Sequence, residues 1–398
     1  MNYRDRSVGA LIADHRSGHA LASEFYKRDD IFELDIALLQ DRWTCVGHAS
    51  EVSSPGDWTT AELGAESVIV ARGDDGALRA LANVCRHRGS RVCAKARGTA
   101  RVLVCPYHAW SYGLDGLLRQ ARNMPAGFDP AAHALKALPL KEIGGLIFIS
   151  FGDHPPDFER AGEGLGRMTD HYGWAKARVA ERRSYSVAAN WKLVLENYHE
   201  CYHCAPAHPE FSRLHALARP SERRLRLEID PATGWSDLEA WDAAPDGAEV
   251  ARVMRSALSA ECETGSEDGR RFAPLMAPGL SGDCVFAELG FLSAFLAYAD
   301  YGVIYRFIPR GVMATDMEVT WLVHADAKAG RDYDPARLTW LWDITSLADK
   351  RIIETNQAGV LSRHYAPGPF SLMEPGALAY VDRYLGELSL MARGAHGI

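Results

Sequence analysis

The 398-residue sequence lacks several features that would assign it to a broad class of protein. No run of 18 apolar residues occurs, so the sequence predicts no transmembrane helix. The residues after Met1 are polar and charged and lead into no apolar core of a secretory signal. Positive charge is in deficit, because 44 Lys and Arg stand against 52 Asp and Glu, a net charge of −8. This balance argues against nucleic acid and anionic membranes as partners, and we expect a cytoplasmic protein.

The pattern along the chain changes twice. Hydrophobic residues make up 47% of the sequence and charged residues 24%, as in an ordinary globular protein. Residues 1–40 show helical patterns, residues 41–155 show short β runs with Gly and Asp turns, and residues 156–398 mix long strands with helices. The sequence therefore predicts an α+β protein. We expect a helical N-terminal segment that packs on the third region, a small all-β domain, and a larger domain with an antiparallel sheet.

Two pairs of Cys and His lie in the predicted β domain, each just after a predicted strand. Cys85 and His87 form a C-x-H pair, 17 residues follow, and Cys105 and His108 then form a C-x-x-H pair. Two loops can thus present one thiolate and one imidazole apiece, which is the ligand set of a Rieske [2Fe–2S] cluster. Zinc sites of two Cys and two His place the cysteines in one pair and the histidines in another. The spacing therefore favours a Rieske cluster over zinc.

A second group of metal-binding residue types lies near residue 200. Glu200 and His203 are three positions apart in a predicted helix that begins at Trp191, and His208 follows His203 by five residues. A regular helix would turn His208 away from the face of His203. Pro206 lies between them and is expected to end or kink the helix, which lets both rings converge. Two His with one carboxylate and open positions are the ligand set of non-haem Fe(II) oxygenases.

The carboxylate has to come from elsewhere in the chain. The best candidate is Asp349, which lies in a helix predicted over residues 334–363. Asp343 and Glu354 of the same predicted helix are the alternatives.

The eight cysteines do not imply disulfides in a chain of this length. Cys93 lies between the two Cys–His pairs and is expected to be a packed thiol. His199, Cys201 and Cys204 flank the second site but leave the face that its ligands share, so we expect them to pack around it. The remaining cysteines have no histidine at a useful spacing and are expected in the core: Cys45, Cys262 and Cys284.

Together the two motifs resemble those of the α subunits of Rieske non-haem iron oxygenases. The resemblance rests on C-x-H-R-G with C-x-x-H, and on the run from Asn190 to His208, which matches N-W-K, then E-N, then acid-x-x-H-x₄-H. It implies a helix-grip (START-like) fold for residues 156–398 and a mononuclear Fe(II) beside the Rieske cluster. The residues matching the family's iron ligands are His203, His208 and Asp349, and the matching catalytic acid and amide are Glu200 and Asn197.

The acid at position 200 departs from most of that family, which has Asp there. In the family this acid hydrogen-bonds a Rieske histidine of the neighbouring subunit and carries the electron path. Glu200 is similar to the branch that oxidises quaternary ammonium compounds, as are the run from Glu200 to Cys204 and the segment from Gly359 to Glu374. The resemblance implies a terminal monooxygenase that uses O₂ to oxidise or N-demethylate a betaine-type substrate. Aromatic-ring hydroxylation is the alternative, and a Rieske electron carrier, which needs only the β domain, is a remote one.

The sequence contains no motif for an electron source of its own. It has neither a plant-type C-x₄-C-x₂-C motif nor a G-x-G-x-x-G motif after a predicted strand. A separate flavin- or ferredoxin-type reductase that draws on NAD(P)H is therefore implied. The family resemblance further implies a homotrimer in which the cluster of one subunit lies beside the iron of the next.

A quaternary ammonium group donates no hydrogen bond, so a protein holds it by cation–π contact with aromatic rings. Aromatic residues are frequent in residues 286–307, and two tryptophans precede them. We expect most of these rings to be strand core and one or two to line the substrate site. The candidates are Phe286, Phe291, Phe295, Tyr298, Tyr301, Tyr305 and Phe307, with Trp235 and Trp241.

Overall fold

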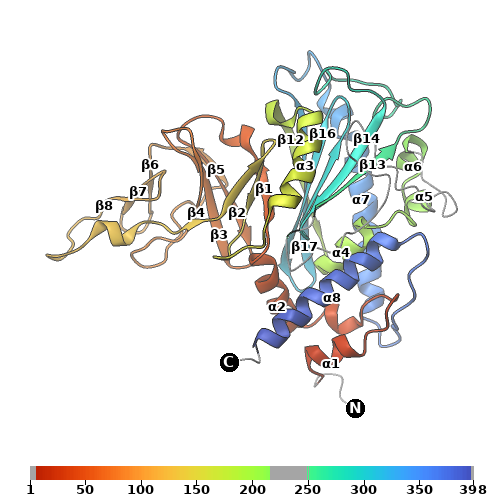
Figure 1. Ribbon diagram of the computed structural model, residues 1–398, viewed down its shortest axis with the longest axis horizontal. Helices are drawn as coiled ribbons and strands as arrows, with labels where there is room; N and C mark the ends of the chain where they lie inside the picture. The colour runs from red at the N-terminus through yellow and green to blue at the C-terminus, as the bar shows by residue number, and fades with distance from the viewer. Residues whose placement is uncertain (1–5, 216–248, 250, 396–398) are drawn as a thin grey trace. The chain divides into compact units, whose positions relative to one another are not determined.

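The computed structural model describes residues 6–215, 249 and 251–395 (Figure 1). The chain divides into two compact units, one of residues 40–156 and a larger one built from residues 1–39 and 157–398. The N-terminal helical segment is thus part of the larger unit. Within the described ranges, no helix is long and apolar enough to cross a membrane.

The smaller unit consists of three antiparallel sheets and two short 3-10 helices, η3 (Ala49–Val52) and η4 (Pro130–His133). The strand orders are β5-β2-β3-β4-β9, β1-β11-β10 and β6-β7-β8. The predicted all-β region is therefore confirmed. The strands are β1 (Thr44–His48), β2 (Asp57–Leu63), β3 (Glu66–Arg72), β4 (Leu78–Ala82), β5 (Arg97–Thr99), β6 (Val102–Val104), β7 (Ser111–Gly113), β8 (Leu118–Gln120), β9 (Ala137–Leu138), β10 (Leu140–Ile143) and β11 (Leu146–Ile149).

Tight turns join the hairpins where the sequence has its Gly and Asp residues. Gly116 has a φ of +83°, and its N–H donates to the carbonyl of Gly113 at 2.9 Å, which closes the turn between β7 and β8. A side chain at position 116 would also meet Leu81. Only glycine combines this positive φ with this close approach.

The core of the smaller unit lies beneath the two Cys–His loops. Cys85 and Cys105 are 3% and 2% exposed and pack in one hydrophobic cluster with Trp110 and Tyr112. Cys93 is buried in the same cluster and is a free thiol, as predicted. The two Cys–His loops are thus anchored through their cysteines in one hydrophobic cluster.

The larger unit is built on one six-stranded antiparallel sheet, in the order β12-β17-β16-β15-β14-β13. Most side chains of the long strands β16 and β17 are buried. The strands are β12 (Ala177–Val187), β13 (Ala251–Ala257), β14 (Asp283–Leu289), β15 (Ser293–Ala297), β16 (Gly302–Gly311) and β17 (Ala314–His324).

Helices pack against this sheet, as an α+β fold requires (Figure 1). The 26-residue α7 contacts β12 and β17, α4 contacts β16 and β17 and also packs on α7 and α8, and α3 contacts β13 and β14. Asp334 starts α7 by accepting the N–H of Ala336 at 2.9 Å, with Pro335 in the first turn. The helices are α1 (Val8–Ala13), η2 (Ser23–Tyr26), α2 (Asp29–Gln40), α3 (Glu159–His171), η5 (Trp174–Lys176), α4 (Trp191–Tyr198), α5 (Cys204–Ala207), α6 (Pro209–Leu214), α7 (Pro335–Val360) and α8 (Pro375–Ala395).

A buried ion pair joins α2 to α4. Lys192 Nζ pairs with Asp35, and both side chains are 0% exposed. Asp35 also accepts the indole N–H of Trp191 at 3.0 Å and the hydroxyl of Tyr384 at 2.7 Å. Every oxygen of the buried carboxylate is therefore used, and the N-terminal segment is tied to the helix that leads to residue 200.

Replacing Lys192 with methionine should lower the free energy of unfolding of the larger unit by about 3–5 kcal/mol, because it leaves the Asp35 carboxylate buried without its cation. Urea unfolding of the purified protein, followed by tryptophan fluorescence, measures this loss. The matched control is the double variant Lys192→Met with Asp35→Leu, which removes both charges and should recover most of the stability. An unchanged unfolding midpoint in the single variant would contradict the assigned role.

Candidate metal centres

The structure brings His203, His208 and Asp349 together, although 141 residues separate the last two. Asp349 Oδ1 lies 2.7 Å from His208 Nε2 and 3.3 Å from His203 Nε2. One ligand atom from each residue lies within 4.8 Å of the other two. His208 is buried and the other two side chains are largely buried. Two imidazole nitrogens and one carboxylate oxygen therefore converge on one point.

The sequence predicts a helix from Trp191 that Pro206 ends or kinks, but the helix ends well before that residue. α4 ends at Tyr198, residues 199–203 form a turn, and the short α5 then leads to His208 at the start of α6. The break precedes Pro206, so proline is not its cause. Instead the Glu200 carboxylate accepts the backbone N–H groups of Tyr202 and His203, which competes with helical hydrogen bonding. Glu200 and His203 thus meet across a turn and not on a helix face.

Glu200 and Asn197 both lie against His203. The Glu200 carboxylate is hydrogen-bonded to His203 Nδ1, and Asn197 Nδ2 lies 3.3 Å from His203 Nε2. An imidazole that donates Nδ1–H to a carboxylate keeps the lone pair of Nε2 available, and Nε2 is the atom that faces Asp349. The turn therefore orients His203 for a metal between it and Asp349.

The charges of the site suit a divalent cation. Burial lowers the pKa of His203, but hydrogen bonds with Asp349 and Glu200 outweigh it and raise the pKa to about 9. Burial raises the pKa of Asp349, and its hydrogen bonds with His203 and His208 bring it below its usual value. Without a metal, the negative charge of Asp349 is thus neutralised by a proton on the imidazole of His203. A divalent cation bound by the same three donors replaces that proton, so the residues fit a mononuclear iron.

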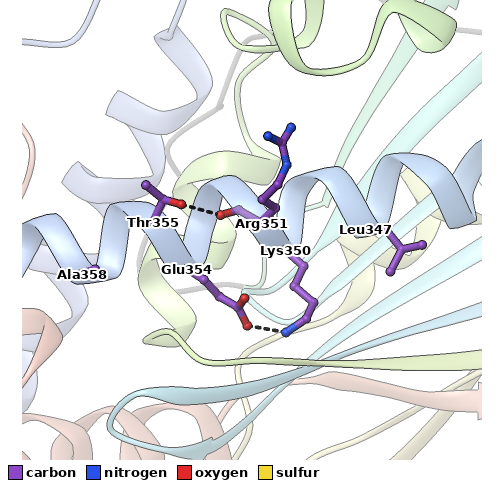
Figure 2. Close-up of a pocket in the computed structure, with 6 residues that line it drawn as sticks. All are labelled: Leu347, Lys350, Arg351, Glu354, Thr355 and Ala358. Carbon is purple, nitrogen blue, oxygen red and sulfur yellow. Dashed lines mark hydrogen bonds and ion pairs between the residues drawn. The ribbon is translucent and has the colours of Figure 1, made fainter.

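The alternative carboxylates of α7 are engaged elsewhere. Asp343 pairs with Arg183 at 2.7 Å and accepts the hydroxyl of Tyr185. Glu354 accepts the N–H of Ala188 at 2.9 Å. It also pairs with Lys350 (Figure 2). A shallow depression on α7 is distinct from the candidate site, because His203, His208 and Asp349 do not line it. The residues that line it are Leu347, Lys350, Arg351, Glu354, Thr355 and Ala358 (Figure 2).

The cysteines beside this site differ from the prediction. Cys201 and Cys204 form a disulfide, whereas the sequence predicts only that they pack around the site. The turn between α4 and α5 brings their Cα atoms to 4.8 Å, within the range that a disulfide spans. Cys45 and Cys284 are buried as predicted, but Cys262 is only half-buried because it lies in a loop outside the sheet.

The first predicted centre has its four residues at the ends of two loops. His87 Nδ1 and His108 Nδ1 lie 3.1 Å apart on the exposed side, while Cys85 and Cys105 are buried in the core below. Two thiolates on the buried side and two imidazoles on the exposed side are the donors that a Rieske cluster needs, one pair for each iron. The donor set therefore fits such a cluster.

Sequence reasoning missed Tyr112, whose hydroxyl lies 3.3 Å from Cys85 Sγ and accepts the N–H of Arg86 at 3.0 Å. Its spacing from Cys105 matches no motif, and only the pairing of β7 with β6 places it beside the other loop. A hydroxyl that donates to a cluster sulfur stabilises the more negative, reduced cluster.

Replacing Tyr112 with phenylalanine should therefore lower the reduction potential of the cluster. A difference of ~1 kcal/mol in this hydrogen bond between the two oxidation states corresponds to ~40 mV for one electron. Redox titration monitored by the visible spectrum of the cluster gives the potential. Tyr107→Phe, at an exposed position beside His108, is the matched control and should leave the potential unchanged.

The aromatic candidates separate into two groups. Phe291 packs on Trp191 and Tyr380, Phe295 on Trp174, and Tyr298 stacks on Tyr301, so these rings are core. Phe286 is half-buried and packs near Phe211 and Trp342. Trp235 and Trp241 lie outside the described residues.

Tyr305 and Phe307 of β16 lie beside the end of α4, the helix that leads to residue 200. Their rings are 5.6 and 5.1 Å from that of Tyr198, the last residue of α4, and the Tyr305 hydroxyl contacts Ser346 of α7 at 2.8 Å. Burial raises the pKa of Tyr198 and Tyr305, and the negative charge of Asp349 adds to this shift. The two tyrosines are therefore neutral, and with Phe307 they form an aromatic cluster in which the charge of Asp349 acts on Tyr198 and Tyr305.

Two known family models match this chain. The Rieske [2Fe–2S] domain matches residues 42–139, and the catalytic domain of ring-hydroxylating alpha subunits matches residues 174–388. The chain therefore belongs to the family of Rieske-type ring-hydroxylating oxygenase alpha subunits. It is an oxidoreductase whose cofactors are a [2Fe–2S] cluster and a mononuclear iron.

Individual relatives show which members of this family the chain is similar to. The glycine betaine monooxygenase oxygenase subunit of Chromohalobacter salexigens is 34% identical, over 94% of this chain and 87% of its own. The carnitine monooxygenase oxygenase subunit of Acinetobacter baumannii is 37% identical over 47% of this chain and 52% of its own. Among solved structures, the quaternary ammonium Rieske monooxygenase CntA superposes with a TM-score of 0.73 at 22% identity, covering 96% of this chain and 99% of that one.

Proposed function

We propose that this chain is the terminal oxygenase component of a monooxygenase that oxidises or N-demethylates a quaternary ammonium, betaine-type substrate. The observation that carries the proposal is the 34% identity, over 94% of the chain, to an oxygenase subunit named for glycine betaine. The aromatic cluster of Tyr198, Tyr305 and Phe307 supports it, because such rings attract a cation that cannot donate hydrogen bonds.

In this proposal His203, His208 and Asp349 hold the mononuclear iron, and Cys85, His87, Cys105 and His108 hold the cluster. When bound, the cluster supplies single electrons and the iron supplies O₂ activation at its open positions. The carboxylate of Glu200 orients His203 by accepting its Nδ1–H, and Asn197 lies beside the same ring. The aromatic cluster holds the ammonium group beside the metal, and oxidation of an N-methyl C–H bond gives a hemiaminal that releases formaldehyde.

The exposure of the two cluster histidines indicates how electrons could reach this protein. His87 and His108 are exposed at the ends of their loops, which leaves them open to a redox partner. We propose a separate flavin- or ferredoxin-type reductase that draws on NAD(P)H, which places the enzyme in the cytoplasm. We further propose a homotrimer in which Glu200 of one subunit accepts a hydrogen bond from a Rieske histidine of the next.

A product assay tests the substrate class. The protein is supplied with O₂, a surrogate reductase and, in turn, glycine betaine, proline betaine, carnitine and choline, and formaldehyde and the demethylated or oxidised product are measured. At least one of these compounds should be turned over. Phe307→Leu should raise the KM for that substrate by ~2–30-fold through loss of ~0.5–2 kcal/mol of cation–π attraction. Phe295→Leu, a core position on β15, is the control.

The aromatic-ring alternative gives a different result in the same assay. If none of the ammonium compounds reacts while an aromatic acid or hydrocarbon yields a hydroxylated ring, the substrate proposal fails. The assignment to the oxygenase family does not depend on this outcome.

A further inference from the structure

The disulfide between Cys201 and Cys204 encloses a proposed iron ligand. The bond closes a ring over Cys201-Tyr202-His203-Cys204, so His203 lies inside it. The other six cysteines form no disulfide. A loop of four residues removes little entropy from the unfolded chain. The effect of this bond therefore falls on the turn that it closes and not on the stability of the whole fold.

Both proposed histidine ligands are connected to this ring through the backbone. The N–H of Cys204 donates to the carbonyl of Cys201 at 3.3 Å, and the carbonyl of Cys204 accepts the N–H of His208 at 2.8 Å. The N–H of Ala207 donates to the carbonyl of His203 at 3.0 Å. A change in the ring is therefore passed to His203 directly and to His208 through one hydrogen bond.

The pair is open to small reagents from one side. Cys204 is buried, but Cys201 is only half-buried and the neighbouring Tyr202 is 57% exposed. A small thiol can thus reach Cys201 Sγ, while Cys204 Sγ is shielded and leaves as the displaced sulfur. Disulfides in reducing compartments are usually transient and redox-sensing rather than structural.

We propose that Cys201 and Cys204 form a reversible dithiol–disulfide pair whose oxidation state sets how firmly the turn holds His203 against the mononuclear iron. This inference rests on the proposed ligand role of His203. In the disulfide state the closed turn keeps His203 Nε2 facing Asp349, 3.3 Å from its Oδ1. In the dithiol state the turn keeps only its hydrogen bonds, and iron leaves more readily.

The chemistry balances with common reagents. A dithiol attacks Cys201 Sγ, the Cys201–Cys204 bond breaks, and a second thiolate of the reagent resolves the mixed disulfide. The reagent ends as a cyclic disulfide, and both cysteines end as thiols after taking up the two protons. Hydrogen peroxide restores the bond: two thiols and one peroxide give one disulfide and two waters, through a sulfenic acid on one sulfur.

The test compares the two states of the full-length protein without oxygen. Both samples start from protein without mononuclear iron: one is reduced with dithiothreitol and desalted, the other is reoxidised with one equivalent of hydrogen peroxide and desalted, and both are then loaded with Fe(II). Alkylation followed by peptide mass spectrometry reports the thiols of residues 201 and 204. A colorimetric chelator reports the rate of Fe(II) release, and the visible spectrum reports the cluster. Hydrogen exchange of residues 204–208 in the iron-free protein reports the turn without any metal.

We expect Fe(II) to be released at least tenfold faster from the reduced protein, with the cluster spectrum unchanged and amide exchange of residues 204–208 accelerated. Cys201→Ser with Cys204→Ser should behave as reduced protein under both treatments. Cys262→Ser, which removes a half-buried thiol outside the turn, should behave as wild type. Because the wild-type comparison needs no variant, poor folding of the double variant does not remove the test.

Two results would overturn the inference: a 201–204 peptide that is fully alkylated without prior reduction, or equal iron release and equal amide exchange in the two states. A failure of the ligand assignment is recognised separately, because Asp349→Ala would then keep its mononuclear iron.

Discussion

Replacing Asp349 with alanine is expected to remove the mononuclear iron and leave the Rieske cluster intact. The wild-type chain should bind three irons, two in the cluster and one at the site of His203, His208 and Asp349. Without the carboxylate, two neutral imidazoles remain, which lowers both the number of ligands and the negative charge that attracts the cation. Iron analysis should fall from three to two per chain, and the visible spectrum of the cluster should stay unchanged.

Turnover of this variant should fall by more than ~100-fold, because even residues that only orient metal ligands cost ~10–100-fold when they are removed. Asp343→Ala is the matched control on the same helix, since Asp343 is engaged by Arg183 and Tyr185 and should leave all three irons in place. A bleached cluster in Asp349→Ala, or retention of all the iron, would show that the ligand assignment is wrong.

Replacing Glu200 with glutamine is expected to retain both metals and nearly abolish turnover. The amide oxygen of glutamine can still accept the N–H groups of Tyr202 and His203, so the turn and the iron should remain. The negative charge beside His203 Nδ1 is lost, and with it the strong acceptor that a Rieske histidine of a neighbouring subunit would need. We expect the rate of product formation to fall by ~100-fold or more.

Electron delivery can be separated from the other steps in this variant. Dithionite should reduce the cluster as in the wild type, whereas a single turnover started from the reduced cluster should yield almost no product. Glu210→Gln, in the first turn of α6, changes a carboxylate of the same region and should keep normal activity. Near-normal activity of Glu200→Gln would exclude a bridging role, and a fully active monomer would contradict transfer between subunits.

Local sequence patterns determined much of what this protein is. The Gly and Asp turns of residues 41–155 predicted the hairpins that the smaller unit contains, because such turns depend on residues at fixed short spacing. The two Cys–His pairs identified the cluster type for the same reason, since each pair of ligands lies on one loop. The long strands predicted in residues 156–398 are present in the antiparallel sheet, and the helix over residues 334–363 is present as α7.

Other features were decided only by the tertiary structure. The helix predicted from Trp191 to His208 ends early, because the side chain of Glu200 offers the backbone N–H groups partners that periodicity does not reveal. The sequence ranked Asp349 above Asp343 and Glu354, but which of these carboxylates faces His203 and His208 depends on how α7 packs. Tyr112 beside Cys85, and Asp35 beside Lys192, are contacts between elements far apart in the chain. The packing of helices and strands brings the two residues of each contact together, and no local pattern in the sequence predicts that packing.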